Sequence, residues 1–168
     1  MPSSISNLLV TRRSLIGFAA LSLAGCTTYL PEGNTSAPQV SPAIATAKIN
    51  ETRKAYGREP LRFSSTLARA AQNQANLMAA RGEVSHTLGG SLRERVRAVN
   101  YTGPVGEIIA AGQNTLEKAI KGWLDSREHN IILLSTHFSE FGLAVAQGRA
   151  PYKVYWAMIL GGDADRGL

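Results

Sequence analysis

The sequence predicts an α+β domain in which helices surround a small, mostly antiparallel sheet in three layers. Segments with apolar residues at helical spacing come first after residue 41, and two segments rich in β-branched and aromatic residues come last. A turn-like stretch at 147–151 joins those last two segments. The length of 168 residues suits one domain, and the hydrophobic content of 44% is sufficient for a packed core.

The first 25 residues have the composition of an export signal, which is removed from the mature protein. Arg12 and Arg13 precede an apolar run at 15–24, which is shorter than the roughly 20 residues that span a bilayer. The run ends in Leu-Ala-Gly-Cys at 23–26, the order of a lipobox, in which the cysteine receives diacylglycerol. We therefore expect cleavage before Cys26 and lipid on its thiol, rather than a buried free thiol in a signal anchor.

The residues around the arginine pair indicate how the protein is exported. The segment Thr-Arg-Arg-Ser-Leu-Ile at 11–16 resembles the twin-arginine export motif, although two arginines before an apolar run also serve the general secretory route. The sequence thus predicts an exported, membrane-anchored lipoprotein of the bacterial cell envelope, on the periplasmic side in a Gram-negative cell.

The cysteine count and the net charge limit how the domain can be stabilised and which partners it can bind. A single cysteine leaves no pair for a disulfide, so the domain must be stabilised by its core. The formal charge of +6 falls to +4 without Arg12 and Arg13, which favours mild attraction to anionic surfaces. Basic residues alternate at 93–97 without interleaved aromatic residues, so we expect a solvated helix face there and no nucleic-acid partner.

The mature chain divides into a tether and a domain. Residues 26–41 are rich in proline, serine and threonine, with little apolar periodicity, which predicts a flexible, lipid-bearing tether. The domain is expected over 42–168.

Four segments of the domain are predicted to be helical from the spacing of their apolar residues and from their end signals. They are 42–56 (Pro42 in the first turn, Gly57 beyond the end), 65–81 (Ser65 as cap, Gly82 beyond the end), 91–99 (Ser91 as cap) and a helix capped by Thr115 that carries Trp123.

Three segments are predicted to be strands, at 105–111, 138–146 and 154–160, and the last two form a hairpin. Because no disulfide can compensate for a missing apolar face, we expect the helix with Trp123, the helix at 65–81 and the hairpin to share one core.

Four ionisable side chains lie beside turns or at the ends of predicted elements: His86, Glu107, His129 and Glu140. Such a residue alone is more often solvated or hydrogen-bonded at the surface, and the third histidine, His137, is assigned that role. Since side chains alternate along a strand, a core position for Phe141 would turn Glu140 to solvent or to a cleft.

Several short motifs follow one another in order over 49–161. They are Ile49-Asn50-x-x-Arg53, Pro60-Leu61-Arg62, Leu67-Ala68-x-Ala70-Ala71, Met78-Ala79-x-Arg81-Gly82, Ser85-His86-Thr87, Gly106-Glu107-x-Ile109-Ala110, Trp123-x-x-Ser126, His129, Phe138-Ser139-Glu140-Phe141-Gly142 and Tyr155-Trp156. Together these motifs resemble a bacterial member of the CAP (SCP-like) superfamily, which includes cysteine-rich secretory proteins, antigen 5 and pathogenesis-related 1. The resemblance implies an α-β-α sandwich.

The resemblance also implies a surface cleft around two histidines and one or two glutamates. By motif match these are His86, Glu107 and His129, and Glu140 falls where bacterial members commonly show Phe-Thr-Glu-Ile-Gly. Two positions depart from the family pattern. Relatives resemble Gly-Glu-Asn-Ile-Ala where this chain has Ile108, and Gly-His-Arg-Ala-Asn-Ile-Leu where it has Ile132. We expect the cleft to persist with a more apolar wall.

Three functions are compatible with these residues. A non-catalytic module that binds an amphiphilic or cell-wall-derived ligand is favoured. The alternative is a metal-assisted hydrolase, because His86, His129 and a carboxylate can hold Zn²⁺ and leave a position open for water, although no His-Glu-x-x-His helix supports it. A structural envelope protein with a vestigial cleft is the third. Serine catalysis is not expected, because Ser85 directly precedes His86 and adjacent side chains of an extended chain point apart, and because Ser126 lacks the flanking glycines of a nucleophile elbow.

Overall fold

The computed structural model describes residues 37–162, and the predicted export signal with Arg12 and Arg13, the predicted lipidation site Cys26 and most of the predicted tether lie outside that range. Helices and strands follow in the order α1 (Pro42–Ala55), β1 (Arg62–Phe63), α2 (Ser65–Arg81), α3 (Leu92–Arg97), β2 (Val105–Ala111), α4 (Leu116–Asp125), α5 (Arg127–Leu133), β3 (Glu140–Gln147) and β4 (Val154–Gly161). Within the described residues, no helix is long and apolar enough to cross a membrane.

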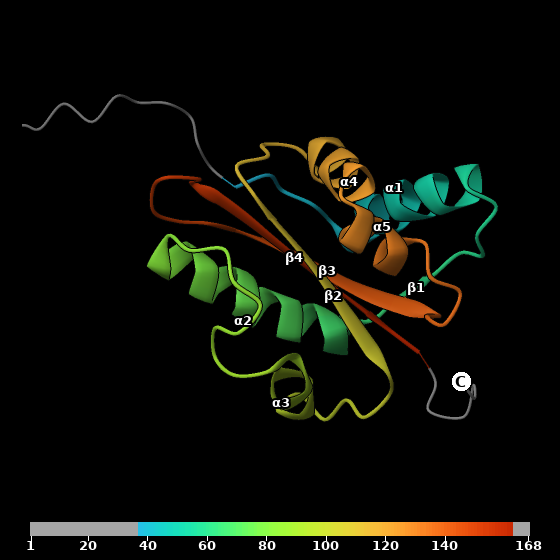
Figure 1. Ribbon diagram of the computed structural model, residues 1–168, viewed down its shortest axis with the longest axis horizontal. Helices are drawn as coiled ribbons and strands as arrows, with labels where there is room; N and C mark the ends of the chain where they lie inside the picture. The colour runs from blue at the N-terminus through green and yellow to red at the C-terminus, as the bar shows by residue number, and fades with distance from the viewer. Residues whose placement is uncertain (1–36, 163–168) are drawn as a thin grey trace, which may run out of the picture. The chain divides into compact units, whose positions relative to one another are not determined.

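The four strands form one sheet in the order β1-β3-β4-β2. Strands β2 and β3 both run antiparallel to β4, whereas β1 runs parallel to β3 and covers only its first two residues. Helices α1, α4 and α5 lie on one face of this sheet, and α2 and α3 lie on the other (Figure 1). The predicted α+β class, with three layers and a small, mostly antiparallel sheet, is therefore confirmed.

Side-chain caps explain where the helices begin. The Ser91 hydroxyl accepts a hydrogen bond from the backbone N–H of Glu94, and the Glu94 carboxylate accepts one from the backbone N–H of Ser91. Thr115 caps α4 by accepting from the backbone N–H of Lys118, so both predicted caps are confirmed. The cap of α2 is Ser64 rather than the predicted Ser65, because Ser64 has the extended backbone of a cap residue and Ser65 is already helical. Gly82 ends α2 with a φ of 71°, a conformation that favours glycine.

Two short elements were not predicted. The two residues of β1 are too few to show alternation, and they become a strand only because Glu140 and Phe141 lie beside them. The seven residues of α5 make about two turns, and Ser126, in an extended conformation, separates them from α4. Helix α5 therefore changes direction from α4 and carries His129.

The sheet divides the interior into two apolar clusters, which corrects the expectation of one shared core. Trp123 of α4 packs with Phe141 and Trp156 on the face covered by α1, α4 and α5. Helix α2 packs with Tyr155 and Ile159 on the other face. All eight residues of β4 are buried, and its alternating side chains supply both clusters. Of the three parts expected to share one core, only the hairpin contributes to both clusters.

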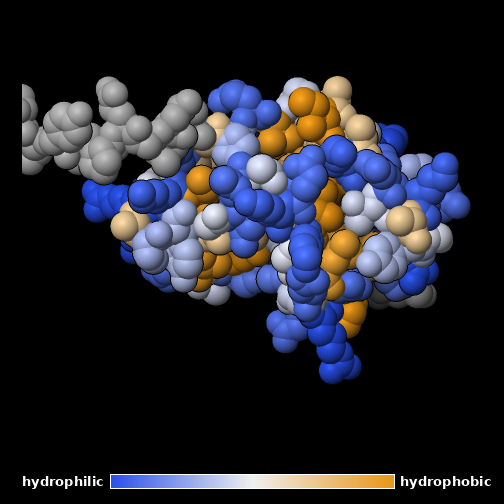
Figure 2. Space-filling view, turned by 90° about the horizontal axis from the view of Figure 1, so that it is seen from above, coloured by the Kyte–Doolittle hydropathy of each residue, from blue (hydrophilic) through white to orange (hydrophobic). Residues whose placement is uncertain are grey.

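The outer face of the α1 and α4 layer is mostly hydrophilic. Seen from that side, apolar side chains form separate small patches between charged and polar ones (Figure 2). The ion pairs of this layer join residues of both signs, for example Lys48 with Glu51 and Lys121 with Asp125.

Replacing Trp123 by alanine should lower the free energy of unfolding by about 3–5 kcal/mol. Trp123 is 1% exposed, and its indole N–H donates to the carbonyl of Ile109 at 3.1 Å, so the change opens a cavity and leaves an unpaired carbonyl. Urea denaturation of the mature protein measures the loss. Tyr56→Ala, at an exposed aromatic residue, is the control, with an expected loss below about 1 kcal/mol. A similar small loss for Trp123→Ala would contradict its place in the core.

Candidate functional site

His86 and Glu107 are in direct contact although 21 positions separate them. His86 lies in the loop between α2 and α3, and its Nδ1 is 2.9 Å from Oε2 of Glu107. The Glu107 side chain points from the middle of β2 toward the α2 side of the sheet and is 2% exposed, whereas the His86 side chain is 51% exposed. A buried carboxylate thus fixes one nitrogen of an imidazole whose other nitrogen can face solvent.

Arg95 completes the pair and was not predicted as a site residue. Its Nη1 lies 2.7 Å from Oε1 of Glu107 and its Nη2 lies 3.0 Å from Oε2, a bidentate ion pair. Arg95 also donates to the backbone carbonyls of His86 and Gly90, at 2.9 and 3.3 Å. It therefore attaches the loop that carries His86 to the sheet.

The expectation of a solvated helix face at 93–97 is wrong for Arg95, whose side chain is only 6% exposed. Residues two apart on a helix point to opposite sides, so Arg93 and Arg97 cannot share a face with Arg95. Because α3 packs against β2, one of the alternating arginines faces the sheet and meets Glu107. The spacing of the three arginines, two residues apart within one helix, was the sequence signal that Arg95 faces inward, and the prediction of a solvated face did not take it into account.

His129 lies beside His86. It belongs to the first turn of α5, and the two imidazole rings are 6.3 Å apart between centroids, tilted by 45°. Burial lowers the pKa of His129, the nearby His86 lowers it further, and Glu128 partly offsets these effects. The neutral form of His129 is therefore favoured. The structure thus brings together three of the four sequence-derived candidates, from a loop, a strand and a helix.

Glu140 has partners of its own. Its Oε1 accepts a hydrogen bond from the hydroxyl of Tyr101 at 2.8 Å, and its Oε2 is 3.4 Å from Nη2 of Arg62. Phe141 is in the core, so Glu140 points to the opposite face, as alternation predicts. That is the face of Glu107, but β4 lies between β3 and β2, and the contacts of Glu140 connect it to Tyr101 and Arg62 rather than to the histidines.

One of the two isoleucines that depart from the family pattern does not line the site, contrary to expectation. Ile108 follows Glu107 on β2, so it points to the opposite face and is fully buried in the cluster with Trp123. An asparagine side chain there would need buried hydrogen-bond partners. Ile132 is partly buried, packs against the same cluster and approaches Gly106.

The residues at the site do not fit a three-ligand zinc centre. Both oxygens of Glu107 are bonded to Arg95 or His86, and the guanidinium cation beside them opposes a metal ion. Two imidazoles remain, fewer than the three protein ligands of a catalytic zinc. Among residues 37–162, no group of three histidine, cysteine, aspartate or glutamate side chains is placed to hold a metal ion.

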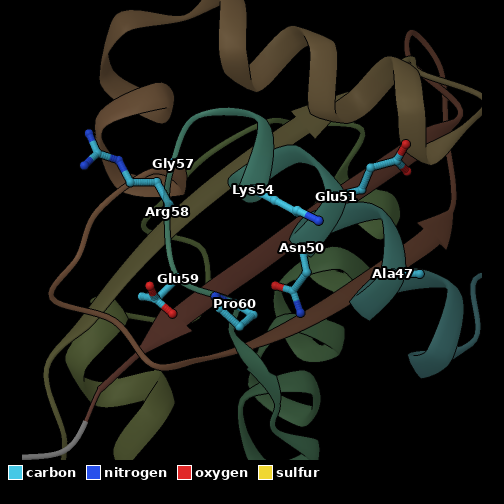
Figure 3. A pocket seen from close by; sticks show the side chains of 8 residues that line it. All are labelled: Ala47, Asn50, Glu51, Lys54, Gly57, Arg58, Glu59 and Pro60. Carbon is cyan, nitrogen blue, oxygen red and sulfur yellow. The ribbon is translucent and has the colours of Figure 1, made fainter.

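A separate cavity of about 690 Å³ lies along α1 and the segment that follows it (Figure 3). It is lined by Ala47, Asn50, Glu51, Lys54, Gly57, Arg58, Glu59 and Pro60. The Asn50 amide donates to the carbonyl of Leu61 and accepts from its N–H, so it connects α1 to the chain before β1. The cavity shares no lining residue with the histidine cluster.

The fold and the cluster define a class of small domain: a three-layer α-β-α sandwich in which a loop, a strand and a short helix bring together two histidines and a glutamate. A model of the cysteine-rich secretory protein family, CAP, matches residues 46–160. The chain belongs to this family.

Individual relatives agree with this assignment. The uncharacterized protein YkwD of Bacillus subtilis is 28% identical over 120 residues, which cover 67% of this chain but only 46% of YkwD. An outer surface protein of Borrelia burgdorferi is 21% identical, with a TM-score of 0.64 over 76% of this chain and 98% of that one. An extracellular protein of Bacillus anthracis that contains an SCP domain is 21% identical, with a TM-score of 0.61 over 76% of this chain and 45% of that one. At these identities the solved structures support the fold.

Replacing Arg95 by methionine should lower the free energy of unfolding by about 3–5 kcal/mol, because Glu107 would keep its charge in a buried position without its cation. The matched control is Arg97→Met on the same helix, with an expected loss below about 0.5 kcal/mol because Arg97 is exposed. Chemical denaturation at neutral pH compares the two. Equal losses would show that the ion pair contributes nothing beyond the loss of a surface arginine.

Proposed function

We propose that this protein is an exported lipoprotein whose CAP domain is a non-catalytic binding module, holding an amphiphilic or cell-wall-derived ligand beside His86 and His129. The observation that carries the proposal is the arrangement around Glu107. Its carboxylate accepts two bonds from Arg95 and contacts the ring of His86. Such a carboxylate, bonded at both oxygens and only 2% exposed, positions a histidine and is not accessible to the water from which a general base must take a proton.

The surroundings of the two imidazoles favour an amphiphilic ligand. His129 is neutral at neutral pH because its pKa is lowered, so it can donate or accept a hydrogen bond without adding charge. Val84, an exposed apolar residue, lies two positions before His86 in the same loop, whereas Ile131, two positions after His129 on α5, points away from it. The site therefore offers polar ring atoms on a loop that also carries one exposed apolar side chain, a combination that suits an amphiphile.

The N-terminal residues support attachment to the envelope. Lipid on Cys26 would hold the domain at a membrane through the tether at 26–41, and export would use the twin-arginine route through Arg12 and Arg13. One solved relative is named an outer surface protein and another an extracellular protein, which fits a location outside the cytoplasm.

Changing Cys26 to serine should abolish labelling by radioactive palmitate and leave the precursor unprocessed, because the thiol is the acceptor of the lipid. The labelled wild-type protein and the variant are compared on a gel after growth in labelled fatty acid. Label that enters the serine variant would refute the anchor.

His86→Ala and His129→Ala should each reduce the amount of co-purified ligand several-fold while the melting temperature is unchanged. Mature protein is purified without chelator, non-covalently bound lipids and cell-wall fragments are extracted and identified by mass spectrometry, and zinc is measured in the same samples. His137→Ala is the matched control, because His137 is exposed and outside the cluster. If the wild-type protein holds stoichiometric zinc and both variants lose it, the site is a metal centre and the proposed binding module is wrong. If both variants retain the ligand, the ligand does not bind at these histidines.

A further inference from the structure

Helix α2 and the turn between β3 and β4 present basic side chains without acidic ones. Neither 65–81 nor 147–153 contains an aspartate or a glutamate. The exposed cations of these two segments, named here the basic face, are Arg69, Arg81, Arg149 and Lys153. Within residues 37–162, no salt bridge involves any of them. Their charges are thus available to a partner.

Backbone contacts fix the turn against the end of α2. The N–H of Arg149 donates to the carbonyl of Ala79 at 2.9 Å, and the hydroxyl of Tyr155 donates to the carbonyl of Arg149 at 2.8 Å. Gly148 lies so close to Ala79 that a Cβ atom at Gly148 would collide with the helix backbone. The cations of the turn are therefore held near Arg81 by the fold, which lowers the entropy cost of binding through them together.

An aromatic residue accompanies these cations. Tyr152 is 44% exposed and packs edge-on against Tyr155, with ring centroids 6.0 Å apart. Tyrosine is enriched where proteins meet the headgroup region of a bilayer, because its ring is apolar and its hydroxyl is polar. The turn thus combines lysine, arginine and an exposed tyrosine on one rigid loop.

The opposite face of the domain lacks this bias. On α1 and α4, Lys48 lies within salt-bridge distance of Glu51 and Glu117, and Lys121 pairs with Asp125. Positive charge therefore exceeds negative charge around α2 and the turn, where the exposed Glu83, two residues beyond Arg81, is the nearest carboxylate in the sequence. Attraction of anions by a local cluster of cations can be distinguished from attraction by the net charge of the whole protein, because variants of equal net charge can remove cations from different faces.

The N-terminal segment meets the domain close to the basic face. Residues 37–40 line a cavity of about 280 Å³ together with Gln72 of α2 and with 143–145 of β3, which leads directly into the turn. As a random coil, the expected tether at 26–41 would span only about 20 Å. A domain anchored through Cys26 would therefore remain close enough to the bilayer for its charges to act on lipid headgroups.

We propose that the basic face docks on the anionic bilayer surface to which the protein is anchored. This inference rests on the proposed lipid anchor. The loop that carries His86 begins directly after α2, so docking would hold the ligand site near the lipid surface, which suits exchange of an amphiphile with the bilayer. Phosphate headgroups supply the negative charge, and Tyr152 would lie at the interface.

The test uses mature protein from residue 26 with Cys26→Ser, produced without lipid, so that its outcome does not depend on acylation. Cosedimentation with vesicles of phosphatidylglycerol and phosphatidylethanolamine should show binding that weakens with salt and is absent for phosphatidylcholine vesicles. Replacing Arg149 and Lys153 by glutamine should weaken the binding about 25-fold, since each charge near an anionic surface contributes about fivefold.

The matched control replaces Lys54 and Lys118 of α1 and α4 by glutamine, which gives the same net charge, and should change binding less than about twofold. Equal weakening in the two double variants would show that net charge alone acts, and would overturn the proposal. Absence of binding to the phosphatidylglycerol vesicles would overturn it too, as would tighter binding of duplex DNA than of vesicles. Because the Cys26→Ser protein carries no acyl chain, a failure to bind vesicles would not contradict the proposed lipid anchor, which the palmitate labelling tests separately.

Discussion

The site depends on a buried carboxylate that needs a cation. Glu107 points from β2 into a layer lined mostly by apolar residues, where an isolated charge would cost several kcal/mol. Arg95 supplies the cation in bidentate geometry, and its remaining bonds go to the loop of His86. The pair therefore helps to fix the position of α3, the path of that loop and the orientation of the imidazole, together with the buried Gln74, whose amide donates to the carbonyl of Ser85. Helix α3, with six residues, is too short to be stable by itself and is fixed by this pair and by Val96.

A second buried arginine, Arg53, is stabilised by backbone carbonyls rather than by a carboxylate. Arg53 of α1 is 1% exposed and donates to the backbone carbonyls of Glu59, Leu133 and Ser135. Burial, together with the nearby Arg58, lowers its pKa, but an arginine stays charged under ordinary conditions. Leu133 ends α5, where the helix dipole places partial negative charge, so the guanidinium is stabilised without a carboxylate. Arg53 thus connects α1 to the helix that carries His129, as Arg95 connects α3 to the loop that carries His86.

Much of the fold was accessible from the sequence because local signals agree with the tertiary structure. The caps Ser91 and Thr115, the terminating Gly82 and the three long strands followed from residue type and spacing. The short elements β1 and α5 were inaccessible, since two and seven residues contain too little periodicity and form through contacts with distant residues. The convergence of His86, Glu107 and His129 came from motif order, not from spacing. The inward position of Arg95 could have been predicted, because residues two apart on a helix point to opposite sides, so Arg93, Arg95 and Arg97 cannot all face solvent. The inward direction of Ile108 could have been predicted from the alternation of side chains along a strand.

The brevity of β1 has a consequence for how the isolated domain behaves. Because β1 pairs with β3 only at Glu140 and Phe141, the rest of that edge of β3 has no strand beside it among residues 37–162, and the segment at 37–40 lies near its middle instead. Unpaired strand edges invite pairing with another chain, and proteins commonly block them with a loop or a proline. Pro38 lies in this segment, and Val40 packs against the core. Residues 37–40 thus lie beside this strand edge, and a shortened protein that began at Pro42 would leave it more exposed to other chains.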